Sequence, residues 1–145
     1  MKNQRPCSIA GTLAVIGEKY SVLVLREVFF GVRRFDAIAR NLGAPRDVLA
    51  ARLRHLVEAG VLERVPYQER PQRFEYRPTR AGRELRPVLL TLMAWGDRHI
   101  SEHPPVVFEH DCGTDLKPVV VCKHCGGEAT SRSLTPRFAD PEWAA

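Results

Sequence analysis

The hydrophobic positions between residues 35 and 60 recur at helical spacing in two consecutive segments. Apolar residues lie three or four positions apart, first at Phe35, Ile38, Ala39 and Leu42, and then at Leu49, Leu53, Leu56 and Val57. Each segment therefore predicts a helix with one apolar stripe, and the two stripes are expected to bury each other. Gly43 and Pro45 stand between them, because glycine accepts a left-handed backbone and proline presets the start of a helix. The pattern predicts a helix-turn-helix.

With the apolar stripe of the second helix turned inward, helical geometry directs small and charged residues outward. This outward face carries Asp47, Ala50, Ala51 and Arg54, with Arg46 at its leading end. Such a face can enter a DNA major groove, where arginine pairs with guanine edges or binds phosphates. The alternative is the ordinary charged surface of a helical hairpin, and this stretch alone leaves both interpretations open.

The segments before the helix-turn-helix are apolar on nearly all sides. Residues 9–16 predict one short helix, and Ser21 is expected to cap a second helix over residues 21–30. The second segment is rich in valine, so a buried strand is an alternative, but its length and the following Gly31 favour a helix. More than one neighbour must cover such segments, which indicates a bundle core or a subunit contact.

A β-hairpin is predicted directly behind the helix-turn-helix. Residues 61–67 and 73–78 predict strands, and residues 68–72 form a polar loop between them. The second strand alternates aromatic and charged residues, which is typical of a half-buried strand. A hairpin in this position, with Arg70 and Arg73 near its tip, is the layout of a wing that lies along DNA; an ordinary exposed turn is the alternative.

A long helix is expected over residues 80–100, with Thr79 as its cap. Pro87 should kink this helix or move its start to about Leu85. The wide apolar stripe of the helix consists of Leu85, Val88, Leu89, Leu92 and Trp95. Because so small a domain does not need a stripe of this size, we expect this helix and the first helix to pair with a second copy of the chain. The result would be a two-fold homodimer with two reading helices.

Charge is unevenly distributed along the 145 residues. Residues 1–101 carry 18 Lys and Arg against 10 Asp and Glu, whereas residues 102–145 carry 4 against 7. The basic part suits a polyanion such as nucleic acid, because neutralised phosphates release counterions. The chain has no run of about 18 apolar residues and no signal-peptide core, so we expect a cytoplasmic protein with no membrane partner. We divide it into a domain over residues 1–101 and a Cys-rich extension over residues 102–145.

The extension contains three of the four cysteines in a spacing that suggests a metal site. The motif His110-Asp111-Cys112-Gly113 and the motif Cys122-Lys123-His124-Cys125-Gly126 lie on either side of residues 115–121, which predict a strand. A glycine after a cysteine pair forms the tight turn of a zinc knuckle. The set His110, Cys112, Cys122 and Cys125 would complete a tetrahedral shell for structural zinc.

The identity of the fourth ligand stays open at this point. Glu109, His124 and His103 are alternatives to His110, since each lies close to the cysteines in the sequence. A redox-active pair of Cys122 and Cys125, or thiols without any ligand, are the alternatives to zinc. A metal would help the extension to fold, because so short a segment has little core. Trp143 in the last residues is expected to dock on the rest of the chain.

Over residues 5–100 the motifs resemble the HxlR family of bacterial winged-helix transcription regulators, relatives of the MarR group. The resemblance rests on IGEKYSVLVLRE, RRFDAIARNLGAPRDVLAARLRHLVEAGVLER, YQERPQRFEYRPTRAGREL and Trp95-Gly96, in the family's order and spacing. It implies an α+β, mainly α, winged helix-turn-helix with a two-stranded wing and a dimerisation helix. It also implies a homodimer that binds a pseudopalindromic operator in double-stranded DNA and represses, or less often activates, nearby genes.

The resemblance and the residue pattern together give a set of candidate functional residues. The candidates for DNA binding are Arg34, Arg46, Asp47, Ala50, Arg52, Arg54, Arg70 and Arg73. Tyr20 and Pro45 depart from the family pattern, which usually has Trp and commonly Ser at these places. The resemblance implies that Cys7 senses quinones, aldehydes or oxidants, and a buried or silent thiol is the alternative. A small-molecule effector in a pocket beside the dimer helices rests on family analogy alone.

Three functions from different classes are weighed against these observations. The first is a dimeric, sequence-specific DNA-binding regulator, in particular a repressor, that responds to redox chemistry or small electrophiles. The second is a winged-helix module whose basic face binds protein, with a structural zinc tail. The third is a thiol–disulfide oxidoreductase, which the pattern disfavours because Cys122 and Cys125 are not at a strand-to-helix junction. No cluster of acid, base and nucleophile occurs elsewhere, so the sequence predicts no enzyme.

Overall fold

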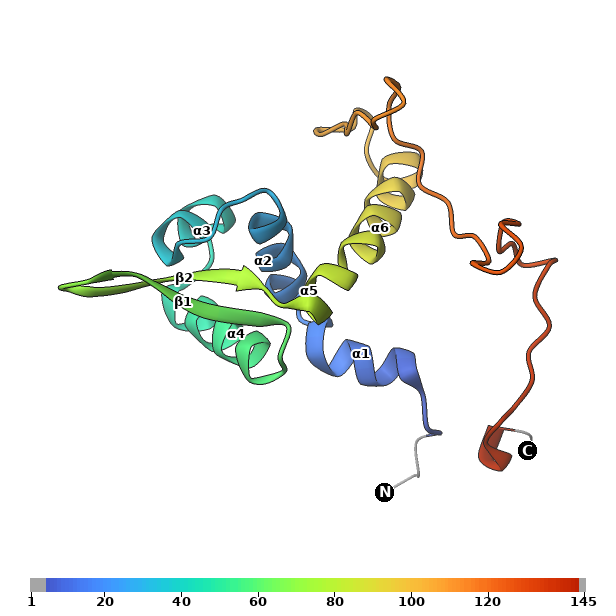
Figure 1. Ribbon diagram of the computed structural model, residues 1–145, viewed down its shortest axis with the longest axis horizontal. Coiled ribbons are helices and arrows are strands. Elements are labelled where there is room, and N and C mark those ends of the chain that lie inside the picture. The colour runs from blue at the N-terminus through green and yellow to red at the C-terminus, as the bar shows by residue number, and fades with distance from the viewer. Residues whose placement is uncertain (1–4, 144–145) are drawn as a thin grey trace. The chain divides into compact units, whose positions relative to one another are not determined.

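The computed structural model describes residues 5–143, and helices predominate in it (Figure 1). The elements are α1 (Ser8–Ile16), α2 (Lys19–Phe29), α3 (Phe35–Leu42), α4 (Arg46–Glu58), β1 (Leu62–Glu69), β2 (Gln72–Pro78), α5 (Arg80–Glu84), α6 (Arg86–His99) and the short 3₁₀ helix η1 (Pro141–Trp143). This mainly helical α+β fold with one two-stranded sheet confirms the predicted fold class.

Contacts divide the described chain into two compact units. One unit comprises residues 7–89, and the other contains residues 5–6 together with residues 90–143. The division falls within α6, ahead of the predicted domain boundary after residue 101, which stays a prediction. No single helix among the described residues is long and apolar enough to cross a membrane, and the pair formed by α1 and α2, which passes on length and composition, is bent by 76°.

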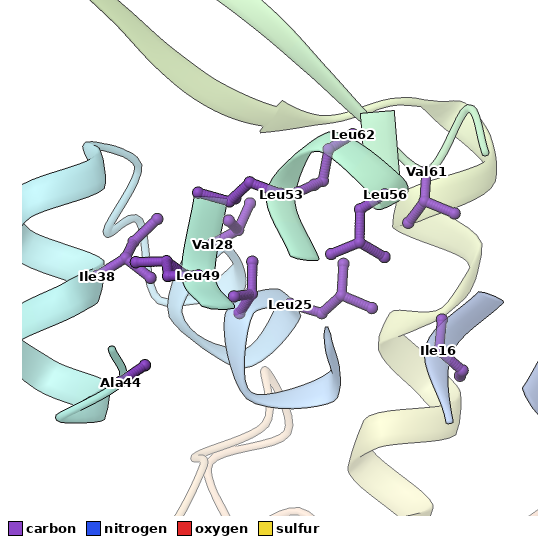
Figure 2. Packing of buried hydrophobic residues seen from close by; sticks show 11 residues of the cluster. Ile16, Leu25, Val28, Ile38, Ala44, Leu49, Leu53, Leu56, Val61 and Leu62 are labelled. Carbon is purple, nitrogen blue, oxygen red and sulfur yellow. The ribbon is translucent and has the colours of Figure 1, made fainter. Parts of the chain in front are cut away.

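The core of the first unit lies between α2 and α4. Leu49, Leu53 and Leu56 of α4 have no exposed surface, and Figure 2 shows them facing Leu25 and Val28 of α2. Burying one such leucine stabilises a fold by about 1.5–3 kcal/mol relative to leaving it exposed. The cluster is completed by Ile16, Val24, Ile38, Ala44, Val61 and Leu62. The apolar stripe predicted from spacing is therefore the stripe that the fold buries.

The turn between α3 and α4 follows the predicted backbone chemistry. Gly43 has φ +59°, a left-handed conformation that side chains with a Cβ rarely adopt. Pro45 then precedes the first residue of α4, Arg46, at the N-cap position. The helix-turn-helix prediction is confirmed, and this turn fixes the direction in which α4 leaves α3.

The expected cap of the second helix is wrong. Helix α2 begins at Lys19 with Glu18 as its N-cap residue, and Ser21 lies inside the helix. The Ser21 side chain is fully buried, and its hydroxyl has no hydrogen-bond partner among the described residues. The helix starts earlier because the chain turns immediately after Gly17, where α1 ends. The alternative of a buried strand is also wrong, since α2 packs against α3 and α4 as a regular helix.

A buried carboxylate joins α2 to α3. Glu27 is 6% exposed, and its Oε2 accepts a hydrogen bond from Asn41 Nδ2 at 2.8 Å. Its other oxygen accepts from the guanidinium of Arg26, with 2.7 Å between Arg26 Nη2 and Glu27 Oε1. A buried charge is tolerated only when it is paired and hydrogen-bonded. Both oxygens are satisfied here, so Glu27 holds the first helix of the helix-turn-helix in place.

The predicted hairpin is present, with longer strands and a shorter loop than expected. β1 and β2 pair antiparallel from Leu62–Pro78 to Glu69–Gln72, which leaves only Arg70 and Pro71 at the tip. The register shifts between Pro66 and Gln68, so β1 has an extra residue there. In Figure 1 the hairpin extends away from helices α2, α3 and α4, as the wing of this fold class does.

The wing is attached to the helices at its base. The Tyr76 amide in β2 donates to the Arg33 carbonyl just before α3, at 2.8 Å. After β2, Thr79 caps α5, because its Oγ1 accepts from the Gly82 amide at 3.1 Å and donates to the Gly60 carbonyl at 2.6 Å. The predicted cap at Thr79 is confirmed. The predicted effect of Pro87 on the helix is also confirmed, since α5 ends at Glu84 and a separate helix, α6, begins at Arg86.

Two helices expose much of their apolar surface. In α1, Ile9 and Leu13 are 71% and 56% exposed, and in α6, Val88, Leu92 and Trp95 are 41%, 54% and 53% exposed. Helix α6 contains no buried residue, although Leu85 and Leu89 lie against the core. Both helices therefore present large apolar side chains at the surface of the described part of the chain.

The extension has little regular structure. The predicted strand over residues 115–121 is wrong, because this segment contributes only single bridges, Glu109 with Asp115 and Val121 with Glu128. No described residue between 102 and 143 is buried, so side-chain packing does not support a longer strand. Near the end of the chain, the Trp143 indole donates a hydrogen bond to the Pro6 carbonyl within the second unit.

Candidate nucleic-acid interface

The reading helix α4 presents the face that helical spacing predicts. Asp47 and Arg54 are exposed, while Ala50, Ala51 and Arg52 are half-buried beside the stripe that enters the core. Small side chains at the middle of this face keep it narrow, so the backbone of α4 can approach another surface closely. The packing of the leucines on the opposite side fixes the rotation of the helix, and therefore the direction of Arg54.

Arg46, at the leading end of α4, is held by α3. Its Nη1 lies 2.9 Å from Asp36 Oδ1, and its guanidinium stacks over the Phe35 ring at 4.8 Å. The two charged side chains are 70% and 78% exposed, and an ion pair this open to water contributes little stability. Arg46 is therefore positioned without being locked, and a phosphate can replace Asp36 as its partner at small cost.

An open groove of about 720 Å³ separates α3 from the wing, and we call it the α3–wing groove. Its lining consists of Arg34, Phe35, Asp36, Ala37, Arg40, Arg64, Tyr67, Gln72, Arg73, Phe74 and Tyr76. Four arginines and one aspartate give this surface an excess of positive charge. Because Asp36 both lines the groove and pairs with Arg46, the leading end of α4 adjoins the groove.

Two arginines of the groove lie over aromatic rings. The Arg34 guanidinium is 4.1 Å from the centre of the Tyr67 ring, and the Arg64 guanidinium is 3.8 Å from that of Phe74. Stacking orients the plane of a guanidinium and leaves the N–H groups at its edge available for other partners. Those N–H groups match the oxygens of a phosphate, so the groove is suited to bind a polyanion.

The structure places the predicted DNA-binding residues in one unit but in three settings. Arg34 and Arg73 line the α3–wing groove, Arg70 is exposed at the tip of the wing, and the others belong to α4. Sequence reasoning missed Arg40 and Arg64 as members of the groove. Arg64 lacks a signal in the sequence, because residues 61–67 do not alternate cleanly. Its contact with Phe74 depends on the strand pairing, in which the two lie diagonally across the hairpin.

The residues predicted to bind zinc are not assembled into a shell. Among residues 5–143, no group of three His, Cys, Asp or Glu side chains is positioned to hold a metal ion. Cys112, Cys122 and Cys125 are exposed free thiols. The zinc prediction is not tested by this arrangement and stays a prediction.

Local hydrogen bonds nevertheless act on two of these thiols. The backbone N–H groups of Cys125 and His124, together with the Cys125 side chain, hold the pKa of the Cys122 thiol below its ordinary value. The hydroxyl of Thr114 and then its backbone do the same for the pKa of Cys112. Donors directed at a sulfur favour the thiolate, which is the form that binds metals and reacts with electrophiles.

A helix-turn-helix with a two-stranded wing behind it and a basic surface beside its reading helix defines a winged helix-turn-helix DNA-binding protein. The sequence profile of the HxlR-like helix-turn-helix family matches residues 15–104. The chain therefore belongs to the HxlR-like family of helix-turn-helix transcriptional regulators, and this family is one of regulators rather than enzymes.

Individual relatives agree with this assignment. The HTH-type transcriptional regulator Rv3095 of Mycobacterium tuberculosis is 49% identical over 132 residues, which cover 89% of this chain and 84% of the relative. YtcD of Bacillus subtilis, also named an HTH-type transcriptional regulator, is 33% identical over 101 residues, covering 69% of this chain and 80% of the relative. Both names describe transcriptional regulators, as the family does.

Solved structures extend the similarity beyond the winged domain. The crystal structure of PA1607 matches with a TM-score of 0.79 and 35% identity, covering 94% of this chain and 97% of that one. The redox regulator HypR in its reduced form matches with a TM-score of 0.59 and 28% identity, covering 65% of this chain and 96% of that one. The likeness to PA1607 therefore includes much of the extension, whereas the likeness to HypR is confined to a smaller part.

Proposed function

We propose that the protein is a dimeric, sequence-specific repressor that binds a pseudopalindromic operator. The observation that carries this proposal is the combination of an exposed reading face on α4 with the arginine-rich α3–wing groove beside its leading end. Major-groove contacts supply specificity, and phosphate contacts supply position and much of the affinity. Both kinds of contact are available on one compact unit.

Each group of arginines has its own role in this proposal. Arg54, in the middle of α4 and exposed, reads base edges in the major groove. Arg46 exchanges its partner Asp36 for a phosphate at the groove entrance. Arg34, Arg64 and Arg73 hold the flanking backbone along the α3–wing groove, and Arg70 does so at the tip of the wing.

Two reading helices are needed for an operator with two half-sites. The exposed apolar residues of α1 and of α6 supply surfaces on which a second copy can pack, because large apolar side chains at such exposure favour association. In a two-fold dimer on B-form DNA, the reading helices meet successive major grooves about 34 Å apart or at a multiple of that distance. A bound dimer at an operator represses by excluding the transcription machinery.

The decisive experiment first selects the sequences that the protein binds from random duplexes. The binding free energies of the wild type and of Arg54→Ala are then measured on the selected site and on unrelated DNA. We expect Arg54→Ala to lose about 1–3 kcal/mol of binding free energy on the selected site and little on unrelated DNA. Equal losses on both would make Arg54 a phosphate contact and remove it from base reading. Arg34→Ala is the matched variant, for which we expect similar losses on both kinds of DNA.

Salt titration separates this function from a winged-helix module that binds protein. Each phosphate contact contributes about 0.9 to the slope of log affinity against log salt on duplex DNA, so the groove arginines should give a steep slope. Arg34→Ala should make this slope shallower, whereas Arg54→Ala should change it less. An absence of salt-dependent binding to any duplex would contradict the regulator and favour the protein-binding module.

A further inference from the structure

The first of two small hairpins in the extension is a tight turn around Cys112. Glu109 bridges Asp115 across the hairpin. Inside this bridge, the His110 amide donates to the Thr114 carbonyl at 2.9 Å, and the His110 carbonyl accepts from the Gly113 amide at 2.8 Å. Gly113 follows Cys112 directly and has φ +81°.

The second hairpin has the same plan with one additional residue in its turn. Val121 bridges Glu128 on the outside. The Cys122 amide donates to the Gly127 carbonyl at 2.8 Å, and the Cys122 carbonyl accepts from the Gly126 amide at 2.7 Å. Gly126 follows Cys125 and has φ +73°.

These hydrogen bonds establish which positions of the two hairpins are equivalent. His110 corresponds to Cys122, because each is the first residue inside its bridge and uses both backbone groups within the turn. Cys112 corresponds to Cys125, because each precedes the left-handed glycine. Each hairpin thus carries one soft or borderline ligand at the entrance of the turn and one thiol before the glycine, which is the arrangement of a zinc knuckle.

The equivalence selects the fourth ligand that the sequence left open. Glu109 corresponds to Val121 at the outer bridge, so it is at the position of a residue that cannot bind metal. His124 lies between the two thiols of its own turn and is at neither of the two equivalent positions. His103 is outside both hairpins. His110 alone occupies a ligand position.

The side chain of His110 is already turned towards its own hairpin. Its Nδ1 accepts a hydrogen bond from the Cys112 amide at 3.2 Å. A nitrogen that accepts this bond presents its lone pair there and leaves the ring proton on Nε2. Nδ1 is therefore the nitrogen that can exchange the Cys112 amide for a metal ion, with the amide then free to donate to a sulfur.

Only residues 117–119 connect the two hairpins. The Leu116 amide donates to Phe108 in the first hairpin, and the Ala129 amide donates to Val120 in the second. The four residue steps from Leu116 to Val120 span at most about 14 Å. No residue of the extension whose burial the structure describes is buried, so packing does not fix the hairpins further, and Val119, Val120 and Val121 are 59%, 59% and 50% exposed.

We propose that His110 through Nδ1, together with Cys112, Cys122 and Cys125, binds one zinc ion that joins the two hairpins of the extension. Among residues 5–143 no three such side chains are preassembled, so metal binding brings the two turns together and orders the segment as it does so. Each thiol gives up its proton to solvent when its sulfur binds the ion.

The test uses the untagged full chain, made metal-free under reducing conditions and titrated with cobalt and then zinc. We expect about one cobalt per chain, with a thiolate-to-cobalt charge-transfer band and the intense visible bands of tetrahedral cobalt, all displaced by zinc. The amide resonances of Gly113 and Gly126 should both shift with the same stoichiometry, since one ion contacts both hairpins.

Matched variants distinguish the ligands from their neighbours. His110→Asn and Cys112→Ser should each weaken zinc binding at least about tenfold, whereas Glu109→Gln and His124→Asn should stay within about twofold of the wild type. Far-ultraviolet circular dichroism checks that every variant keeps its helices, so a loss of metal is not a loss of the whole fold.

Three results would overturn the site. The first is less than about half an equivalent of zinc after reconstitution of the reduced chain. The second is a metal bound without a shift of the Gly113 amide, which would confine the ion to the second hairpin. The third is a loss of binding in Glu109→Gln that equals the loss in His110→Asn, since it would contradict the equivalence of the two turns.

Discussion

Cys7 is the residue that precedes α1, and its backbone forms the start of that helix. It occupies the N-cap position with φ −145° and ψ 119°, and its carbonyl accepts from the Gly11 amide at 2.9 Å. The side chain is half-buried and in no disulfide. Because α1 exposes its apolar face, a bulky adduct on Cys7 is well placed to disturb what packs there. We propose that this thiol links oxidants or electrophiles to DNA binding.

A single substitution tests this role. We expect wild-type protein to release operator DNA when treated with diamide or a quinone, because the thiolate attacks such reagents. Cys7→Ser should bind the untreated operator as tightly as the wild type and should stay bound after treatment, as measured by fluorescence anisotropy. Cys125→Ser is the control that should still respond, and release of DNA by Cys7→Ser would exclude the sensor role.

At the scale of elements, α5 contacts the start of the wing so closely at Gly82 that there is no room for a side chain at this position. Helix α5 passes so close to β1 that a Cβ on Gly82 would lie 2.1 Å from the Val61 carbonyl oxygen. The same carbonyl accepts from the Thr79 amide at 3.1 Å, so it cannot move without losing that bond. This junction holds α5 against the start of β1, at the base of the wing.

Gly82→Ala should destabilise the protein, because backbone must shift to make room for the methyl group. We expect a loss of about 1–3 kcal/mol in the free energy of unfolding, measured by urea denaturation at one fixed protein concentration.

Gly11→Ala in α1 is the matched control for this substitution. Apart from its chain neighbours and the nearby backbone of α1, no described atom lies within 4 Å of its added Cβ, and alanine is the better helix former. The midpoint of its urea denaturation should equal or exceed that of the wild type. An unchanged midpoint for Gly82→Ala would show that α5 can move away from Val61 freely.

At the scale of the whole molecule, the exposed apolar side chains of α6 mark the surface on which we propose that a second copy packs. Val88, Leu92 and Trp95 recur at four and three residues along α6, so they share one side of that helix. Trp95 also packs against His99 of the same face, with 5.0 Å between ring centres. A second copy that packs on this face would give the proposed dimer its two reading helices.

If the proposed dimer pairs through α6, Leu92→Glu should convert it to a monomer, because a carboxylate would be buried without a partner in the interface. Sedimentation analysis should report half the mass, and affinity for the two-half-site operator should fall far more than affinity for a single half-site. Arg86→Glu, on the opposite side of α6, is the control that should stay dimeric. A monomeric wild-type protein, or a Leu92→Glu dimer, would contradict pairing through α6.

How far the sequence predicted the fold depended on the range of the interactions involved. Periodic leucines placed α4, Gly43 placed the turn, and Thr79 placed the start of α5, because each signal acts within one or two helical turns. Ser21 was wrong as a cap because the helix begins at Lys19, and the buried position of the Ser21 side chain depends on the neighbouring elements. The strand over residues 115–121 was wrong because its valines meet no opposing apolar surface.

The candidate interface likewise combines features that one helix determines with features that depend on contacts between elements. Spacing placed Arg54 on the outward face of α4, since one helix decides that direction. The partners of Arg46 and Arg64 required tertiary structure, because Asp36 and Phe74 are ten residues away in both cases and on different elements. The membership of the α3–wing groove, Arg40 included, depends on how α3 and the wing are joined through Arg33 and Tyr76.

The sequence by itself determined the family, the order of the elements and the apolar stripe that forms the core, because these are encoded in local periodicity and in residues with special backbone preferences. Only the tertiary structure decided which arginines share a groove, which glycine permits α5 to pack on β1, and that the turns at Cys112 and Cys125 have one plan. The groove and the packing of α5 arise from distances between elements, and the shared plan of the two turns arises from their backbone hydrogen bonds. None of these leaves a periodic trace along the sequence.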